Sequence, residues 1–148
     1  MTFENPLFFW LAPLWIFGWI GISIVFRLTR GKSIFPKRPE GTLFYEGWAS
    51  GRSLATLWGR LGGARNCLMI AITPQELIVT PRFPFNLMFL PEIYGLEARM
   101  PRSQVKVENS YSGILKRGVI VTVGGADPAR IELMPRNKAG FLAALERS

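Results

Sequence analysis

The residues able to do covalent or acid–base chemistry are few in this 148-residue chain, and they form no recognisable set. Histidine is absent, so the commonest general base and the commonest metal ligand are both missing. The single cysteine, Cys67, begins the apolar run CLMIAI and is expected to be a buried strand residue. The ten carboxylates show no spacing typical of a metal site or of a paired acid and base. We therefore expect a protein that is not an enzyme and that uses no cofactor or metal.

Phosphate and nucleic-acid binding are not indicated either. The glycines of RLGGARN (60–66) match neither the Walker nor the dinucleotide-binding spacing, so they predict a turn, and no small-molecule substrate is identified. The formal net charge is +8, but the bases beyond residue 41 are dispersed and carry no recognition helix, zinc spacing or stacking motif. A basic domain held beside an acidic membrane surface explains the charge more simply than nucleic acid does.

The sequence predicts one membrane-spanning segment. Residues 7–26 are twenty residues without a charge, and a helix of that length spans roughly 30 Å, the thickness of a bilayer's hydrocarbon core. A secretory signal peptide fits poorly because Glu4 and no base precede the apolar stretch, and no A-x-A-like site follows it. A buried core helix fits poorly because too few residues are left to enclose a helix that is apolar on every face. We expect residues 1–26 to be a short tail and an uncleaved transmembrane helix.

A basic linker is expected at residues 27–41, extended because Pro36 and Pro39 would interrupt a helix. Its bases are Arg27, Arg30, Lys32, Lys37 and Arg38, with no acid among them. The positive-inside rule places this flank in the cytoplasm, with the amino terminus outside. The five bases would face anionic inner-leaflet lipid, each stabilising the contact by about 1 kcal/mol near the surface. The alternative is that they do no more than set the topology.

Residues 42–148 change character to short β-like runs and are expected to form one domain. Two hairpins are well marked, CLMIAI (67–72) with LIVTP (77–81) and GVIVTV (118–123) with ARIELM (129–134). Further strands are expected in 43–48, 93–101 and 104–109, while 54–66 reads as a strand or a short helix before a glycine turn. Asn137 caps a closing amphipathic helix at 137–147. The predicted fold class is α+β, a transmembrane helix followed by a small antiparallel β-barrel or sandwich with a C-terminal helix.

The hairpin LMIAITPQELIVTP, the GVIVTV–RIEL pair and the helix NKAGFLAAL together resemble a pleckstrin-homology-like domain of the bacterial type attached to membrane helices. The block from Asn66 to Glu97 also resembles small proteobacterial membrane proteins. The resemblance implies a scaffold for binding and a bacterial inner-membrane location. Eukaryotic relatives that bind phosphoinositides place several bases between the first two strands, where this chain has only Arg52 and Arg60. The resemblance therefore does not carry that kind of headgroup binding to this chain.

Two apolar features are candidate contacts with a partner. The segment FPFNLMFLP (83–91) has no charge, and its prolines argue against a regular central strand. Its large apolar residues are Phe83, Phe85, Leu87, Met88, Phe89 and Leu90. Such a segment should be covered by the domain's own core, by the bilayer surface or by another protein, and these three readings stay open. In the helix, Trp15 and Trp19 share a face that could dock a partner helix or simply face lipid.

We expect a non-enzymatic single-pass protein that serves as an accessory or assembly subunit of a larger inner-membrane complex. The helix face and the 83–90 loop would be its contacts, and tethering would add avidity of ~10²–10⁴. The alternative is a stand-alone module that binds anionic lipid at the membrane surface.

The topology makes the first testable prediction. A reporter that is active only in the periplasm, fused after Ser148, should stay silent, because the basic flank holds the domain in the cytoplasm. The same reporter fused to a periplasmic protein is the positive control. Strong activity of the Ser148 fusion would reverse the expected orientation.

Overall fold

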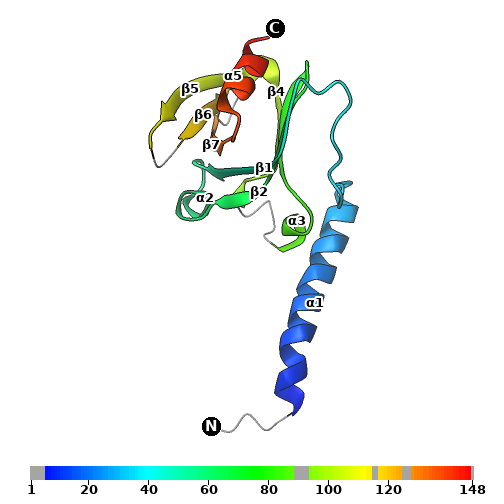
Figure 1. Ribbon diagram of the computed structural model, residues 1–148. Helices are drawn as coiled ribbons and strands as arrows, with labels where there is room; N and C mark the ends of the chain where they lie inside the picture. Colours follow the sequence, from blue (N-terminus) through cyan, green and yellow to red (C-terminus); the bar gives the residue numbers. More distant parts are fainter. Residues whose placement is uncertain (1–5, 89–93, 115–116, 125–127, 148) are drawn as a thin grey trace.

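The computed structural model describes residues 6–88, 94–114, 117–124 and 128–147. It contains one long amino-terminal helix, one antiparallel sheet of seven strands and a carboxy-terminal helix (Figure 1). Helix α1 (Pro6–Thr29) projects from one end of the sheet domain, and most of its length touches nothing else (Figure 1). These features confirm the α+β class expected from the sequence.

The domain begins after a linker of residues 30–43. Its elements are β1 (Phe44–Ser53), α2 (Leu57–Leu61), β2 (Ala64–Ile72), β3 (Glu76–Pro81), α3 (Phe85–Met88), β4 (Ala98–Pro101), a 3₁₀ turn (Arg102–Gln104), β5 (Val105–Ser112), β6 (Arg117–Val123), β7 (Ala129–Met134) and α5 (Lys138–Glu146).

The strands run in the order β4-β3-β2-β1-β7-β6-β5, and every neighbouring pair is antiparallel. The first strand thus joins two consecutive meanders, and the sheet is open between the edge strands β4 and β5. Register shifts around Ala49 let β1 bend and serve both halves. Gly51 lies at this bend, where a Cβ atom would meet the Glu132 carbonyl oxygen and Leu68 Cδ1, each at 2.9 Å. Glycine is needed there because the strands approach so closely.

The main core lies on the inner face of the bent sheet, with α5 packed across it at the end remote from α1 (Figure 1). Phe141 of α5 is fully buried, and its ring meets that of Phe44 edge-on at a centroid distance of 5.7 Å. Asn137 caps the helix by accepting a hydrogen bond from the Gly140 amide at 3.0 Å, as the sequence indicated. The helix therefore closes the core that the two meanders leave uncovered.

The two halves of the sheet differ on their outer faces. Met69 and Ala71 of β2 and Ile78 of β3 form a second buried cluster there, with Tyr45 packed against it. Continuous apolar runs such as CLMIAI are typical of strands covered on both faces, and the cover here is the linker. The outer face of the other half is polar, and Glu132 there accepts hydrogen bonds from Arg52 Nε and the Tyr111 hydroxyl.

Several boundaries differ from those expected. Helix α1 continues to Thr29, so the linker starts later than the expected residue 27, and it packs on the sheet. The ambiguous segment 54–66 is a short helix, α2, followed by the start of β2 at Ala64. In the described part of the strand expected at 93–101, residues 94–101, only Ala98–Pro101 is a strand. The 83–91 segment contains the single turn α3 and no strand in its described part, as its prolines indicated.

Replacing Phe141 by alanine should destabilise the domain by about 3–5 kcal/mol, because it removes the largest apolar side chain that closes the core. Urea unfolding of the purified protein in mild detergent, followed by circular dichroism, measures the loss. Ile114→Ala removes a fully exposed side chain and should change the stability by less than about 0.5 kcal/mol. Equal effects of the two substitutions would contradict the assignment of α5 to the core.

Candidate functional site

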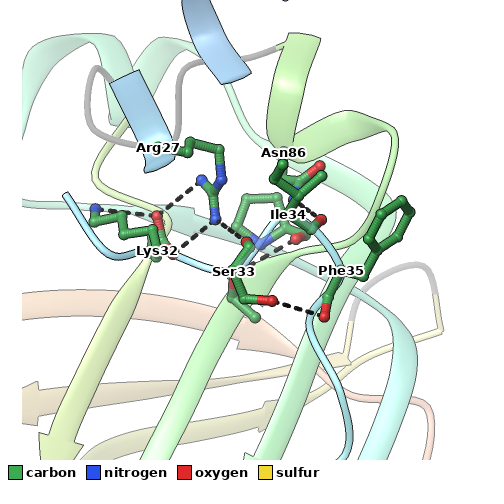
Figure 2. Close-up of polar contacts among 9 residues, drawn as sticks. Arg27, Lys32, Ser33, Ile34, Phe35 and Asn86 are labelled. Atoms are coloured by element: carbon green, nitrogen blue, oxygen red, sulfur yellow. Dashed lines mark hydrogen bonds and ion pairs between the residues drawn. The ribbon is translucent and has the colours of Figure 1, made fainter. Parts of the chain in front are cut away.

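The candidate site is the junction where α1, the linker and α3 meet, and Figure 2 shows its polar contacts in close-up. Ser23 and Arg27 lie one turn apart on the face of α1 that turns toward the domain, and both are buried. The short α3 lies beside the carboxy-terminal turns of α1 (Figure 1). Contact between helix and domain is thus made by the end of the apolar helix itself.

Arg27 is the centre of this junction and is only 1% exposed. Its Nη2 and Nη1 donate to the two carboxylate oxygens of Glu97 at 3.1 and 3.2 Å, and Nη2 also donates to the Ser33 carbonyl oxygen at 2.9 Å (Figure 2). Lys32 Nζ donates to Glu97 Oε2 at 3.2 Å. The forked guanidinium therefore ties the helix end both to the segment before β4 and to the linker.

A second set of contacts holds the linker. Asn86 of α3 is fully buried, and its Nδ2 donates to the Ile34 carbonyl oxygen at 2.6 Å (Figure 2). The Phe35 and Phe83 rings lie 4.8 Å apart between centroids. Among the described residues three buried polar atoms find no hydrogen-bond partner, and these are Ser23 Oγ, Arg27 Nε and Asn86 Oδ1. All three line the same junction.

The linker leaves a cleft of about 440 Å³ against the outer face of β3. The charged residues that line it are Arg27, Lys32, Lys37, Arg99 and Glu97. Met69 and Ile78 form part of its apolar floor. One carboxylate among four cations leaves the cleft basic, so an anionic group fits its charge.

The structure separates the five bases expected at the membrane surface. Arg27 is buried and bound, and Lys32 is half-buried and bound to the same carboxylate. Arg30, Lys37 and Arg38 are exposed. The linker that carries the last two runs from the end of α1 toward the far end of the domain (Figure 1). Since a Debye length is about 8 Å at physiological salt, charges carried that far interact weakly with a surface at the end of α1.

The residues expected to bind a partner are also divided. Leu87 is buried and Phe85 packs against the main core, so both stabilise the domain. Phe83 and Met88 are exposed, although Phe83 also packs on Phe35. Phe89 and Leu90 lie outside the described residues. In the described part of the loop, Phe85 and Leu87 therefore pack in the domain, and Phe83 and Met88 are exposed.

The tryptophan pair in α1 does come together. Trp15 and Trp19 stack with ring centroids 5.9 Å apart, and both are exposed. They lie on the part of α1 that no other described element covers.

Outside the junction, the potentially reactive side chains of Cys67 and Tyr111 are partly or fully buried. Burial raises the pKa of the Cys67 thiol, which disfavours the nucleophilic thiolate. Partial burial and the bond to Glu132 raise the pKa of Tyr111 to about 12, so its hydroxyl stays a proton donor at neutral pH. No group of three potential metal-ligating side chains occurs within the described ranges.

Sequence reasoning missed four polar residues of the junction, namely Ser23, Ser33, Asn86 and Glu97. Asn86 is the one polar side chain in the apolar run 83–90, and a polar residue in such a position is a recognisable signal of a buried hydrogen bond. No comparable signal pairs Glu97 with Arg27.

Comparison with known proteins gives no match: no family model, no curated protein and no solved structure resembles this chain.

Replacing Glu97 by glutamine should destabilise the junction by about 3–5 kcal/mol, because Arg27 would remain buried without a counter-charge. Hydrogen exchange of the purified protein should then show faster deuterium uptake in residues 31–39. Glu76→Gln is the matched control, since its pair with Arg99 is exposed and 3.6 Å long and should contribute at most ~1 kcal/mol. Unchanged uptake in the linker of the Glu97 variant would show that the junction does not depend on this pair.

Proposed function

We propose that this chain is a non-enzymatic single-pass membrane protein that acts as an accessory or assembly subunit of a larger inner-membrane complex. The observation that carries the proposal is the packed junction, in which Arg27 and Asn86 tie α1 and the linker to the domain. A protein that only needed an anchor could use a loose tether. A fixed junction instead presents a helix face and a domain surface to a partner at set positions, which lowers the entropy lost on binding.

The surface of α1 supports its proposed passage through a bilayer. The stretch Phe9–Thr29 is 21 residues long and apolar enough to cross a membrane. Its large side chains, Trp10, Leu14, Phe17 and Ile22 among them, are exposed in the structure. Such a surface would be costly in water and is stabilised in lipid. The exposed Arg30 and the other bases after residue 26 favour the cytoplasm for the domain and the outside for the amino terminus.

The strand order supports a pleckstrin-homology-like identity for the domain, as part of this proposal. Seven strands form two meanders joined through β1, with a carboxy-terminal helix closing the core between the two edges. That arrangement is a scaffold for binding, and fold likeness alone names no ligand.

The docking surface we propose starts at the Trp15–Trp19 pair. Large exposed rings that stack on each other present a stiff apolar ridge for a neighbouring helix. Farther along α1, beside its last turns, Met88 offers an exposed side chain on α3. A partner that contacts both places would gain avidity from the fixed spacing.

A stand-alone lipid-binding module is the second candidate, and the basic cleft under the linker is the observation that favours it. Exposed bases at its rim could take a lipid phosphate. The buried pairing of Arg27 and Lys32 with Glu97 reduces the charge available, so we place this candidate second.

The test is gentle extraction of the tagged protein from its own membranes, native gel migration and mass spectrometry of the band. We expect a band far larger than the 16.7 kDa chain in a micelle, with constant companions. Trp15→Ala with Trp19→Ala should reduce the companions at least about tenfold, because one of two linked contacts is lost.

Trp10→Ala is the matched control. Trp10 and Trp15 are 68% and 69% exposed, but they lie about 140° apart around a helix that turns about 100° per residue. Equal loss of companions in both variants would remove the tryptophan pair from the docking surface. Migration of the unaltered protein as a lone monomer or small homo-oligomer would contradict the proposal and favour the lipid module.

A further inference from the structure

Helix α2 presents an apolar surface that none of the described elements covers. Leu57, Trp58 and Leu61 are 69%, 64% and 77% exposed. Leu61 follows Trp58 by three residues and Leu57 by four, so the three side chains lie on one side of the helix. Exposed side chains of this size in one place mark a contact site more often than scattered single residues do.

The fold itself turns this face outward. Gly59 is the only buried residue of α2, and a Cβ atom there would meet the Ser53 carbonyl oxygen at 2.6 Å. The glycine side of the helix therefore packs on the end of β1, and the three large side chains point away. Thr56 caps the helix through the Gly59 amide at 3.0 Å, and Arg60 Nε donates to the Leu54 carbonyl oxygen at 2.8 Å. The exposed face is thus held in place by local hydrogen bonds.

The position of α2 relative to α1 suggests what covers it. Both α2 and α3 lie at the end of the domain toward which α1 descends, while α5 lies at the opposite end (Figure 1). Along the axis of α1, α2 is level with the carboxy-terminal turns of that helix (Figure 1). If residues 7–26 fill the hydrocarbon core, this level is the interfacial layer of the same bilayer. The junction at Arg27 fixes the relation between the two helices.

The charges beside the patch fit such a surface. The segment 54–66 contains Arg60 and Arg65 and no acid, and both arginines are exposed. Tryptophan is enriched at the membrane–water interface, and each arginine near an anionic surface adds to binding. Apolar side chains with bases at their margin are typical of segments that lie in the plane of the interface.

We infer that α2 is a second membrane contact, in which Leu57, Trp58 and Leu61 enter the interfacial layer of the bilayer that α1 crosses while Arg60 and Arg65 meet anionic headgroups. A five-residue helix would bind a membrane weakly by itself, but the α1 anchor makes its contact intramolecular. The inference rests on the proposed passage of α1 through a bilayer and not on the proposed complex. The domain is then held at two points, with one orientation against the membrane.

The experiment places an environment-sensitive fluorophore on α2. The full-length protein with Cys67→Ala and Leu57→Cys is labelled, purified and reconstituted at high dilution into vesicles of phosphatidylcholine and phosphatidylglycerol. The matched control carries Ala143→Cys, an exposed position of α5 at the far end of the domain. We expect the label at position 57 to emit at shorter wavelength and to be quenched by brominated phospholipid, and the label at position 143 to show neither effect. Adding Arg65→Glu, which leaves the hydrogen bonds of α2 in place, should reduce the quenching at position 57, because acids are repelled by anionic lipid.

Equal emission and quenching at positions 57 and 143, in protein that resists extraction from the vesicles at alkaline pH, would overturn the inference and leave the α1 anchor intact. Loss of the protein from the vesicles at alkaline pH would overturn the anchor, and the inference with it. If the label at position 57 emits at shorter wavelength in native membranes but not in vesicles of purified protein, a protein partner covers α2. That result would also overturn the membrane contact. Shielding that disappears on dilution would assign α2 to a second copy of the chain, with the same consequence.

Discussion

Burial of one positive charge at the end of an apolar helix is the constraint on which the rest of this structure depends. Arg27 follows directly on the uncharged stretch, and a buried guanidinium is tolerated only when its charge and its donors are both matched. Glu97 supplies the charge and the Ser33 carbonyl a further acceptor. Once these three groups meet, the linker must fold back along the sheet and α3 must lie beside α1. The cover over Met69, Ala71 and Ile78 then follows from the path of the linker.

This arrangement gives the domain a defined face toward the proposed membrane. Helices α2 and α3 lie at that face, and α5 lies at the opposite end of the domain (Figure 1). The helix that carries the Trp15–Trp19 pair is joined to the domain by the Arg27–Glu97 pair, and the linker is joined to α3 by the hydrogen bond from Asn86 to Ile34. A surface for a partner and a surface for lipid can therefore be occupied together, because they lie on different elements of one body.

Local patterns in the sequence predicted the elements that depend on near neighbours. The hairpin of CLMIAI with LIVTP, the pair GVIVTV with ARIELM and the Asn137 cap are set by alternation, turn residues and a hydrogen bond within one turn. The pairing of Arg27 with Glu97 and of Asn86 with Ile34 joins residues far apart, which no periodicity encodes. The unbroken apolar run of β2 is typical of a strand that is buried on both faces. Nothing in the sequence, however, identifies the linker as the segment that covers the outer face. The outward face of α2 escaped prediction because it depends on Gly59 meeting β1.

The separation of 70 positions between Arg27 and Glu97 in the sequence also imposes an order in time. The ribosome synthesises Arg27 long before Glu97, so on the proposal that α1 spans a membrane the guanidinium has no counter-ion from Glu97 while the helix is inserted. On the proposed topology, that is the period when flanking charge decides which way the helix enters the membrane. After Glu97 emerges and the sheet folds, the same guanidinium is withdrawn from solvent and fastens helix to domain. Arg27 would thus first help to orient the helix during membrane insertion and later join the helix to the folded domain. The order is fixed because translation produces Arg27 before Glu97.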